Sequence, residues 1–171
     1  LSLADDAEAI DAVTRMNVKK TTTGLVKCWN RHHSRAGAKA VNVGIAHRII
    51  RMLTVGASTE IEHFAAVFLD SASRVQGYHV WEGGTKGVQF KAAEVVRRAM
   101  THSATQILVG HNHPSGRMFP SPSDIAMTKT LATACGMLGI TMIDHIIVGA
   151  HDDQHYSFAQ ANNMPIPDAI Y

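Results

Sequence analysis

Cysteines are scarce in this sequence, and long apolar runs are absent. Cys28 and Cys135 are the only cysteines among 171 residues, and they lie too far apart to form a Cys-x-x-Cys metal knuckle. A chain with two cysteines does not carry a disulfide framework. No stretch reaches the roughly 18 apolar residues of a membrane helix, and no basic start precedes an apolar block as in a signal peptide. We therefore expect a cytoplasmic protein without a membrane partner.

Acidic residues are missing from a long part of the chain, because no Asp or Glu occurs between Ala12 and Thr59. The same stretch holds nine basic residues, namely Arg15, Lys19, Lys20, Lys27, Arg31, Arg35, Lys39, Arg48 and Arg51. The formal net charge of the whole chain is only +2, so the basic residues are concentrated here. The segment from Arg15 to Arg51 can bind DNA by releasing counterions from the phosphate backbone. A solvated basic segment without a nucleic-acid partner is the other interpretation, and both stay open.

The apolar pattern predicts an α/β fold. Hydrophobic residues make up 46% of the chain, enough for a substantial core. Helices and strands alternate, which favours an α/β sandwich with a mixed central sheet. We expect helices at 5–11, 46–53, 92–102 and 122–137, and strands at 64–70, 75–81, 105–109 and 141–148. The apolar faces of the third and fourth helices are predicted to consist of Ala92, Val95, Val96, Ala99 and Met100, and of Leu131, Cys135 and Leu138.

Two histidines follow the third predicted strand. His111 and His113 stand two positions apart, directly after the apolar run that ends at Val109. In an extended strand, residues i and i+2 point to the same side, so both imidazoles can reach one ion. A His-x-His pair alone is a weak signal, because surface strands carry such pairs by chance. The spacing nevertheless makes the two residues candidate metal ligands.

A helix start lies shortly after the histidines. Pro122 is suited to the first helical position, which predicts Ser121 as the N-cap and Asp124 as the third helical residue. The positive end of a helix keeps a carboxylate ionised, as a zinc ligand must be. Ser-x-x-Asp alone is also a common capping box without any metal. Together with the two histidines it predicts three ligands and an open fourth position, which is typical of catalytic zinc.

These residues resemble the JAMM motif of the JAB/MPN+ metalloproteins. The motif is His-x-His, seven intervening residues, then Ser-x-x-Asp, and the string His-Asn-His-Pro-Ser-Gly is similar to the RadC-like branch in particular. The strings at 64–70 and 144–149 also resemble core strands of the family. The resemblance implies an αβα sandwich with a mixed central sheet, similar to that of cytidine deaminases. We predict a basic N-terminal segment at 1–45 and a RadC-like JAB/MPN+ domain at 46–171.

The resemblance also implies a chemistry and residue roles. Family members of this type are zinc-dependent hydrolases that cleave a peptide or isopeptide bond with a water activated by Zn²⁺. Counting back along the first core strand, Glu62 takes the position of the general acid and base, and Glu60, on the same face, is the reserve candidate. Ser121 would donate a hydrogen bond to the oxyanion. The metal ligands would be His111, His113 and Asp124.

A second function of another class stays open. The family name is associated with DNA repair, and the basic segment could make the chain a nucleic-acid-binding module whose metal is structural or vestigial. The complete set of glutamate, two histidines, serine and aspartate favours the hydrolase. His145, beside Asp144 in the strand at 141–148, has two open interpretations: a residue that orients a metal ligand, or a core histidine with satisfied hydrogen bonds.

Overall fold

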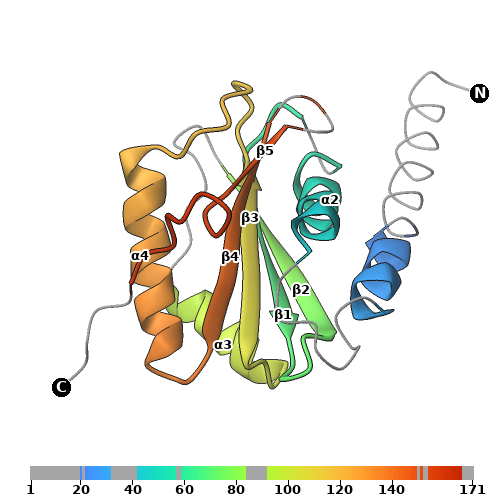
Figure 1. The fold of residues 1–171 in the computed structure, drawn as a ribbon, viewed down its shortest axis with the longest axis vertical. Helices are drawn as coiled ribbons and strands as arrows, with labels where there is room; N and C mark the ends of the chain where they lie inside the picture. Colours follow the sequence, from blue (N-terminus) through green and yellow to red (C-terminus); the bar gives the residue numbers. More distant parts are fainter. Residues whose placement is uncertain are drawn as a thin grey trace, which may run out of the picture.

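The computed structural model describes residues 20, 22–31, 42–56, 59–83, 92–149, 151 and 154–166. Residues 22–31 are helical, and the elements that follow are α2 (Val43–Thr54), β1 (His63–Leu69), β2 (Val75–Glu82), α3 (Ala92–Thr101), β3 (Gln106–Asn112), α4 (Pro122–Gly136), β4 (Thr141–Val148) and β5 (His155–Ser157) (Figure 1). The helices and strands predicted from residue 46 onward are therefore present. The helix predicted at 5–11 lies outside the described residues.

The five strands form one mixed sheet in the order β2-β1-β3-β4-β5. β1 runs antiparallel to both β2 and β3, whereas β3 and β4 are parallel and β5 returns antiparallel to β4. The parallel pair is connected through α4, as a crossover between parallel strands requires. The predicted mixed central sheet is confirmed.

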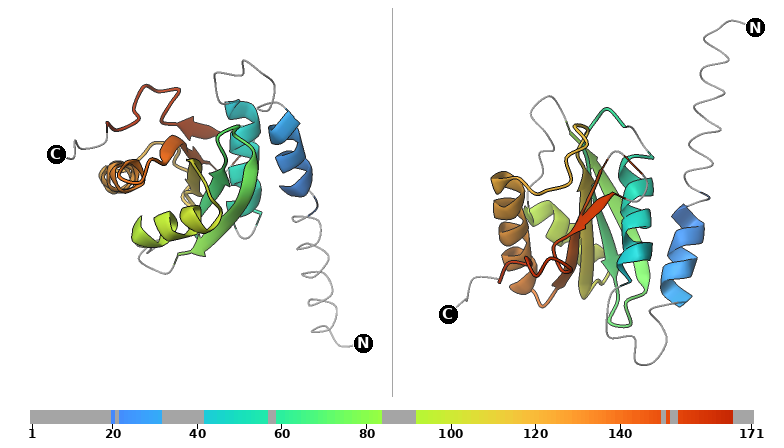
Figure 2. Two further views of the ribbon diagram at one scale, coloured as in Figure 1. Left: turned by 90° about the horizontal axis from the view of Figure 1, so that it is seen from below. Right: turned by 45° about the horizontal axis from the view of Figure 1, so that its top comes forward.

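Both faces of the sheet are covered. β1 is buried along its whole length, and its alternating side chains join two separate apolar clusters. Phe64, Ala66 and Phe68 pack with residues of α3 and α4, whereas Ala65, Val67 and Leu69 pack with α2 and with Trp29 from the helix of residues 22–31. Figure 2 shows the two helical layers on opposite sides of the strands. This arrangement is the expected αβα sandwich.

Two residues predicted to belong to the core are on the surface. The Met100 side chain is 57% exposed and that of Leu138 is 53% exposed. At about 100° per residue, Met100 lies roughly a quarter turn from the centre of the buried stripe of α3. Leu138 follows the end of α4 at Gly136, so helical spacing no longer sets its direction. Leu131 and Cys135 are buried as predicted.

The predicted N-terminal segment contributes to the packing of the domain. Trp29 is 1% exposed, and its indole N–H donates to the carbonyl of Ser73 at 2.6 Å. Its ring belongs to the cluster that contains Ile49 and Ile50 of α2. Within the described part of the chain, no helix combines the length and the apolar character that crossing a bilayer would require.

Candidate metal centre

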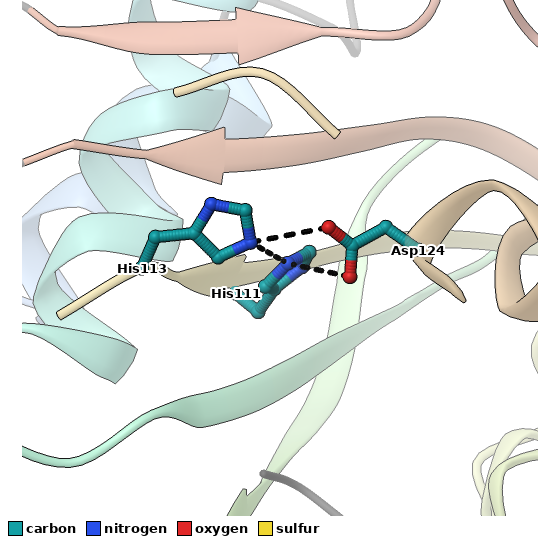
Figure 3. Close-up of side chains that lie close together, drawn as sticks. All are labelled: His111, His113 and Asp124. Carbon is teal, nitrogen blue, oxygen red and sulfur yellow. Dashed lines mark hydrogen bonds and ion pairs between the residues drawn. The ribbon is translucent and has the colours of Figure 1, made fainter. Parts of the chain in front are cut away.

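The three predicted metal ligands lie together at the end of the central strand (Figure 3). His111 is the penultimate residue of β3, His113 follows the strand, and Asp124 lies in the first turn of α4. The two Nε2 atoms are 2.9 Å apart, and the Asp124 carboxylate oxygens lie 3.3 Å from Nε2 of His111 and 3.1 Å from Nε2 of His113. One ligand atom from each residue thus lies within 4.8 Å of those of the other two, so the three could hold one ion.

A relay of hydrogen bonds defines the tautomer of His111. The Thr128 hydroxyl donates its proton to the Asp124 carbonyl at 2.6 Å, so at the Nδ1 of His145, also 2.6 Å away, it must accept. Nδ1 of His145 therefore carries its proton, and its Nε2 accepts from Nδ1 of His111 at 2.8 Å. The Nε2 atom of His111 therefore keeps its lone pair, and this is the atom that faces the other two ligands.

A backbone carbonyl orients His113 so that its Nε2 atom, like that of His111, faces the other ligands. Its Nδ1 donates to the carbonyl of Arg117 at 2.7 Å, within the turn between β3 and α4. The Nε2 atom then faces the carboxylate of Asp124. A ring nitrogen that donates elsewhere and leaves the other free is the usual arrangement of a metal-binding histidine.

Asp124 is part of a complete capping box. The Ser121 hydroxyl accepts from the backbone N–H of Asp124 at 3.1 Å, and the carboxylate accepts from the backbone N–H of Ser121 at 2.9 Å. Burial alone would raise the pKa of this carboxyl, but the neighbouring imidazoles of His111 and His113, when protonated, and the backbone N–H of Ser121 hold its pKa far below the ordinary value. The predicted N-cap is present, and the carboxylate is ionised.

The charge of Asp124 affects the pKa of the neighbouring His113. The hydrogen bond to Asp124 raises the pKa of His113 above its ordinary value; burial acts in the opposite direction, and the negative charge of Glu62 contributes to the increase. Burial lowers the pKa of His145 far below its ordinary value, which keeps that ring neutral. The metal-free centre thus combines an ionised carboxylate, a His113 ring whose protonated form is stabilised by Asp124, and a neutral His145 ring behind them.

Glu62 directly precedes β1 and is half-buried, whereas Glu60 is exposed. Glu62 and Phe64 lie two positions apart and so share a face of the strand, and the ring of Phe64 lies 6.4 Å from that of His111 at 23°. The preferred candidate therefore stands on the face of the sheet that carries the metal centre. Residues 59–61 form a bend, so strand alternation does not extend to Glu60.

Ser121 is exposed at the start of α4. Its oxygen accepts from Asp124, and among the hydrogen bonds of the described residues its proton has no acceptor. The hydroxyl can therefore donate to a group that approaches the centre. Its contribution to the helix cap is a second role, which is independent of any substrate.

Sequence reasoning missed two residues around the centre. Thr128 lies four residues after Asp124 and thus on the same side of α4, a spacing that could have indicated it. Asn112 lies between the two histidines, and its side chain contacts the chain beside Glu62. For His145 both open interpretations apply, since the ring is fully buried with satisfied nitrogens and also binds His111.

The predicted basic segment is only partly available to a phosphate backbone. Among its described residues, Lys20, Lys27, Arg31 and Arg48 are exposed. Arg51, by contrast, is 8% exposed, and its guanidinium donates to the carbonyls of Gly149 at 3.0 Å and Gln154 at 2.8 Å. Arg51 is thus not an exposed cation, because it binds backbone carbonyls between β4 and β5, and DNA binding by the segment stays a prediction.

The fold and the site together define an αβα sandwich with a candidate metal centre of two histidines and one aspartate. Residues 40–164 match the family described as RadC-like JAB domain, and the chain belongs to this family. It is 40% identical over 105 residues to a UPF0758 protein of Xanthomonas campestris pv. campestris (strain 8004), which covers 61% of this chain and 46% of that protein.

Further relatives carry the same name. A UPF0758 protein of Xylella fastidiosa (strain Temecula1) is 39% identical over 100 residues, as is one of Halorhodospira halophila; each match covers 58% of this chain and 44% of the relative. The matched region thus spans about half the length of these relatives. Their name states no activity, so the function of this chain has to be argued from its site.

Proposed function

We propose that this chain is a zinc-dependent hydrolase of the JAMM type, which cleaves a peptide or isopeptide bond. The observation that carries the proposal is the convergence of one atom each from His111, His113 and Asp124, with both imidazoles oriented by their other nitrogen. Histidine and carboxylate ligands suit zinc, and three protein ligands leave one position open. Structural zinc sites instead have four protein ligands.

The spacing of the ligand atoms supports zinc. Atoms about 2.05 Å from a tetrahedral zinc lie about 3.3 Å from one another. The pairs made by Nε2 of His111, Nε2 of His113 and the Asp124 oxygens measure 2.9, 3.1 and 3.3 Å. Each histidine nitrogen thus lies near this spacing from the other and from one carboxylate oxygen, which is Oδ1 for His111 and Oδ2 for His113.

The residues around the metal provide the remaining chemistry. Zinc, when bound, is a Lewis acid that brings the pKa of water towards about 7. Glu62 accepts a proton from the attacking water as the new C–O bond forms, and returns it to the amine nitrogen as the C–N bond breaks. The hydroxyl of Ser121 donates a hydrogen bond to the carbonyl oxygen, which gains negative charge during the attack.

The test compares Glu62→Gln with Glu60→Gln in the full 171-residue chain. The assay measures zinc content and cleavage of quenched fluorescent peptides that contain either an α-peptide bond or an Nε-lysyl isopeptide bond. We expect about one zinc per chain in both variants, and cleavage lost only in Glu62→Gln. Cleavage lost only in Glu60→Gln would reassign the base. A wild-type chain that binds zinc without cleaving any probe would contradict the hydrolase.

A second candidate function is nucleic-acid binding. The helix of residues 22–31 and α2 lie side by side on one face of the sheet, and together they carry the exposed cations Lys27, Arg31 and Arg48 (Figure 2). Binding through phosphates weakens steeply as salt increases. A titration with duplex DNA over a salt series, with and without His113→Ala, separates the functions. Strong salt-dependent binding that survives the loss of zinc would favour the binding module.

A further inference from the structure

The side chain of Asn112 bridges two backbone groups on either side of Glu62. Its Oδ1 accepts from the N–H of His63 at 2.7 Å, and its Nδ2 donates to the carbonyl of Ile61 at 3.0 Å. The residue is 2% exposed; its bond to His63 is buried, and its bond to Ile61 is partly buried. A primary amide provides one acceptor and two donors, and this one uses both kinds of group on the same short segment.

These bonds extend the sheet beyond its regular ladder. The register between β1 and β3 ends at the pair Phe64 and His111, where the next backbone partners would be His63 and Asn112. The amide of Asn112 replaces the missing backbone partner. On the opposite edge of the same segment, the carbonyl of Glu62 accepts from the N–H of Gly83 at 2.7 Å. Residues 61–63 are thus held from both neighbouring strands.

Glu62 is the middle residue of this segment, and we call the hydrogen bonds that hold residues 61–63 the clamp. Its own side chain makes none of the three hydrogen bonds, so the carboxylate stays available on the face that carries Phe64 and His111. A general base has to lie within hydrogen-bonding reach of the water that it deprotonates, and a glutamate side chain reaches a defined point only when its backbone is fixed.

We infer that Asn112 is a positioning residue, which fixes the backbone of Glu62 so that its carboxylate reaches the reaction centre. This inference rests on the proposed hydrolase function. The residues of the His-Asn-His sequence then have separate roles. The two histidines bind the metal, and the asparagine between them holds the segment that carries the base. The metal and the base are then positioned relative to each other by three consecutive residues.

The kinetic test is Asn112→Ala, measured with the fluorescent peptide or isopeptide probe that the wild-type chain cleaves. A misplacement of about 1 Å can cost about 100-fold in rate, so we expect kcat to fall about 10- to 100-fold, with KM within about twofold and zinc content unchanged. Asn112→Ser is a second variant in case the alanine variant does not fold. Its shorter side chain cannot reach both Ile61 and His63.

The matched control is Asn30→Ala. The Oδ1 of Asn30 accepts from the N–H of Val75 at 2.9 Å, so this variant also removes an asparagine bond to a strand N–H, but at β2. We expect its kcat to remain within about twofold of wild type, because independent sites do not couple. An equal loss of kcat in both variants, or loss of zinc in Asn112→Ala, would show that Asn112 acts on general stability or on the ligands.

Amide hydrogen exchange tests the clamp without any activity. We expect exchange at His63 to become at least about tenfold faster in Asn112→Ala and Asn112→Ser, with exchange at Leu108 in the middle of β3 unchanged. If wild type cleaves no probe, the hydrolase proposal fails while this measurement still decides whether the clamp exists. If wild type is active and His63 exchanges faster while kcat stays the same, the positioning role is overturned.

Discussion

The Nδ1 atom of His111 lies 2.8 Å from the Nε2 atom of His145, which joins a candidate metal ligand on β3 to a buried ring on the neighbouring strand β4. His145 in turn binds Thr128 of α4, whose hydroxyl donates to the carbonyl of Asp124. The relay therefore begins at one ligand and ends at the backbone of another. It couples the orientation of the His111 ring to the position of the helix that carries the carboxylate.

We predict that Thr128→Val weakens zinc binding. Valine has nearly the same shape but cannot accept from Nδ1 of His145, so the buried ring loses its partner and the tautomer of His111 is no longer fixed. Changes in groups that orient metal ligands typically cost about 10- to 100-fold in affinity. Competition with a zinc chelator measures the effect.

Thr130→Val is the control for this prediction. Thr130 is exposed on the same helix, so the substitution makes the same chemical change without touching the relay. Its zinc affinity should match that of wild type. Equal affinities in the two variants would mean that the relay does not orient His111.

The ligand set could be predicted because each part of it is local in the sequence. His111 and His113 share a strand face through their spacing, and the position of Asp124 follows from the N-cap at Ser121. Asn112 and Thr128 could not be assigned in this way, because their partners lie far along the chain. The bonds from Asn112 to residues 61–63 depend on the pairing of β1 with β3, which a local pattern does not define.

The exposure of individual side chains was the other property that the sequence could not predict. Composition identifies Arg51 as one cation among several. Its guanidinium is in fact buried and donates hydrogen bonds to two backbone carbonyls after β4. Met100 and Leu138 fit an apolar period, but Met100 lies to the side of the buried stripe of α3, and Leu138 lies beyond the end of α4. A sequence pattern gives the direction of a side chain within an element, whereas the packing of elements decides what covers it.

Zinc affinity should fall as the pH decreases. In the metal-free chain, the hydrogen bond to Asp124 raises the pKa of His113 above 6.5, so at a pH below this raised value zinc must displace a proton. Above the raised pKa the ring is already neutral, and the competition ends. Asp124 does not contribute, because its pKa lies far below this range. The affinity should thus decrease up to about tenfold per pH unit, beginning above pH 6.5.

Calorimetry of zinc binding in buffers of different ionisation enthalpy measures the released protons directly. At about pH 6, below the range in which a zinc-bound water ionises, we expect a proton release that comes from His113, because its raised pKa keeps the metal-free ring protonated there. No release at this pH would contradict the coupling of His113 to Asp124.

Ser121→Ala should affect turnover more than zinc content. Loss of one oxyanion donor commonly costs about 100-fold in kcat. The hydroxyl also caps α4 through the N–H of Asp124, so the free energy of unfolding should fall by about 1 kcal/mol. Ser121→Gly separates the two effects. Glycine at an N-cap lowers the free energy of unfolding by only about a few tenths of a kcal/mol, but it also lacks the hydroxyl donor. Full activity in either variant, or loss of zinc in both, would remove Ser121 from the proposed mechanism.

Gly110→Ala should destabilise the chain next to the metal centre. A Cβ at this position of β3 would lie 2.6 Å from the carbonyl oxygen of Ile146 and 2.4 Å from a side-chain carbon of Ile50, and the backbone oxygen belongs to the paired strand β4. Overpacking of this kind costs about 1–3 kcal/mol, measured by urea unfolding of the metal-free chain. Gly24→Ala is the control: it lies in the helix of residues 22–31 with no atom within 4 Å of its added Cβ, so it should be neutral or stabilising by up to about 1 kcal/mol. If Gly110→Ala is no less stable than Gly24→Ala, β3 and α2 are not packed as closely as the structure shows.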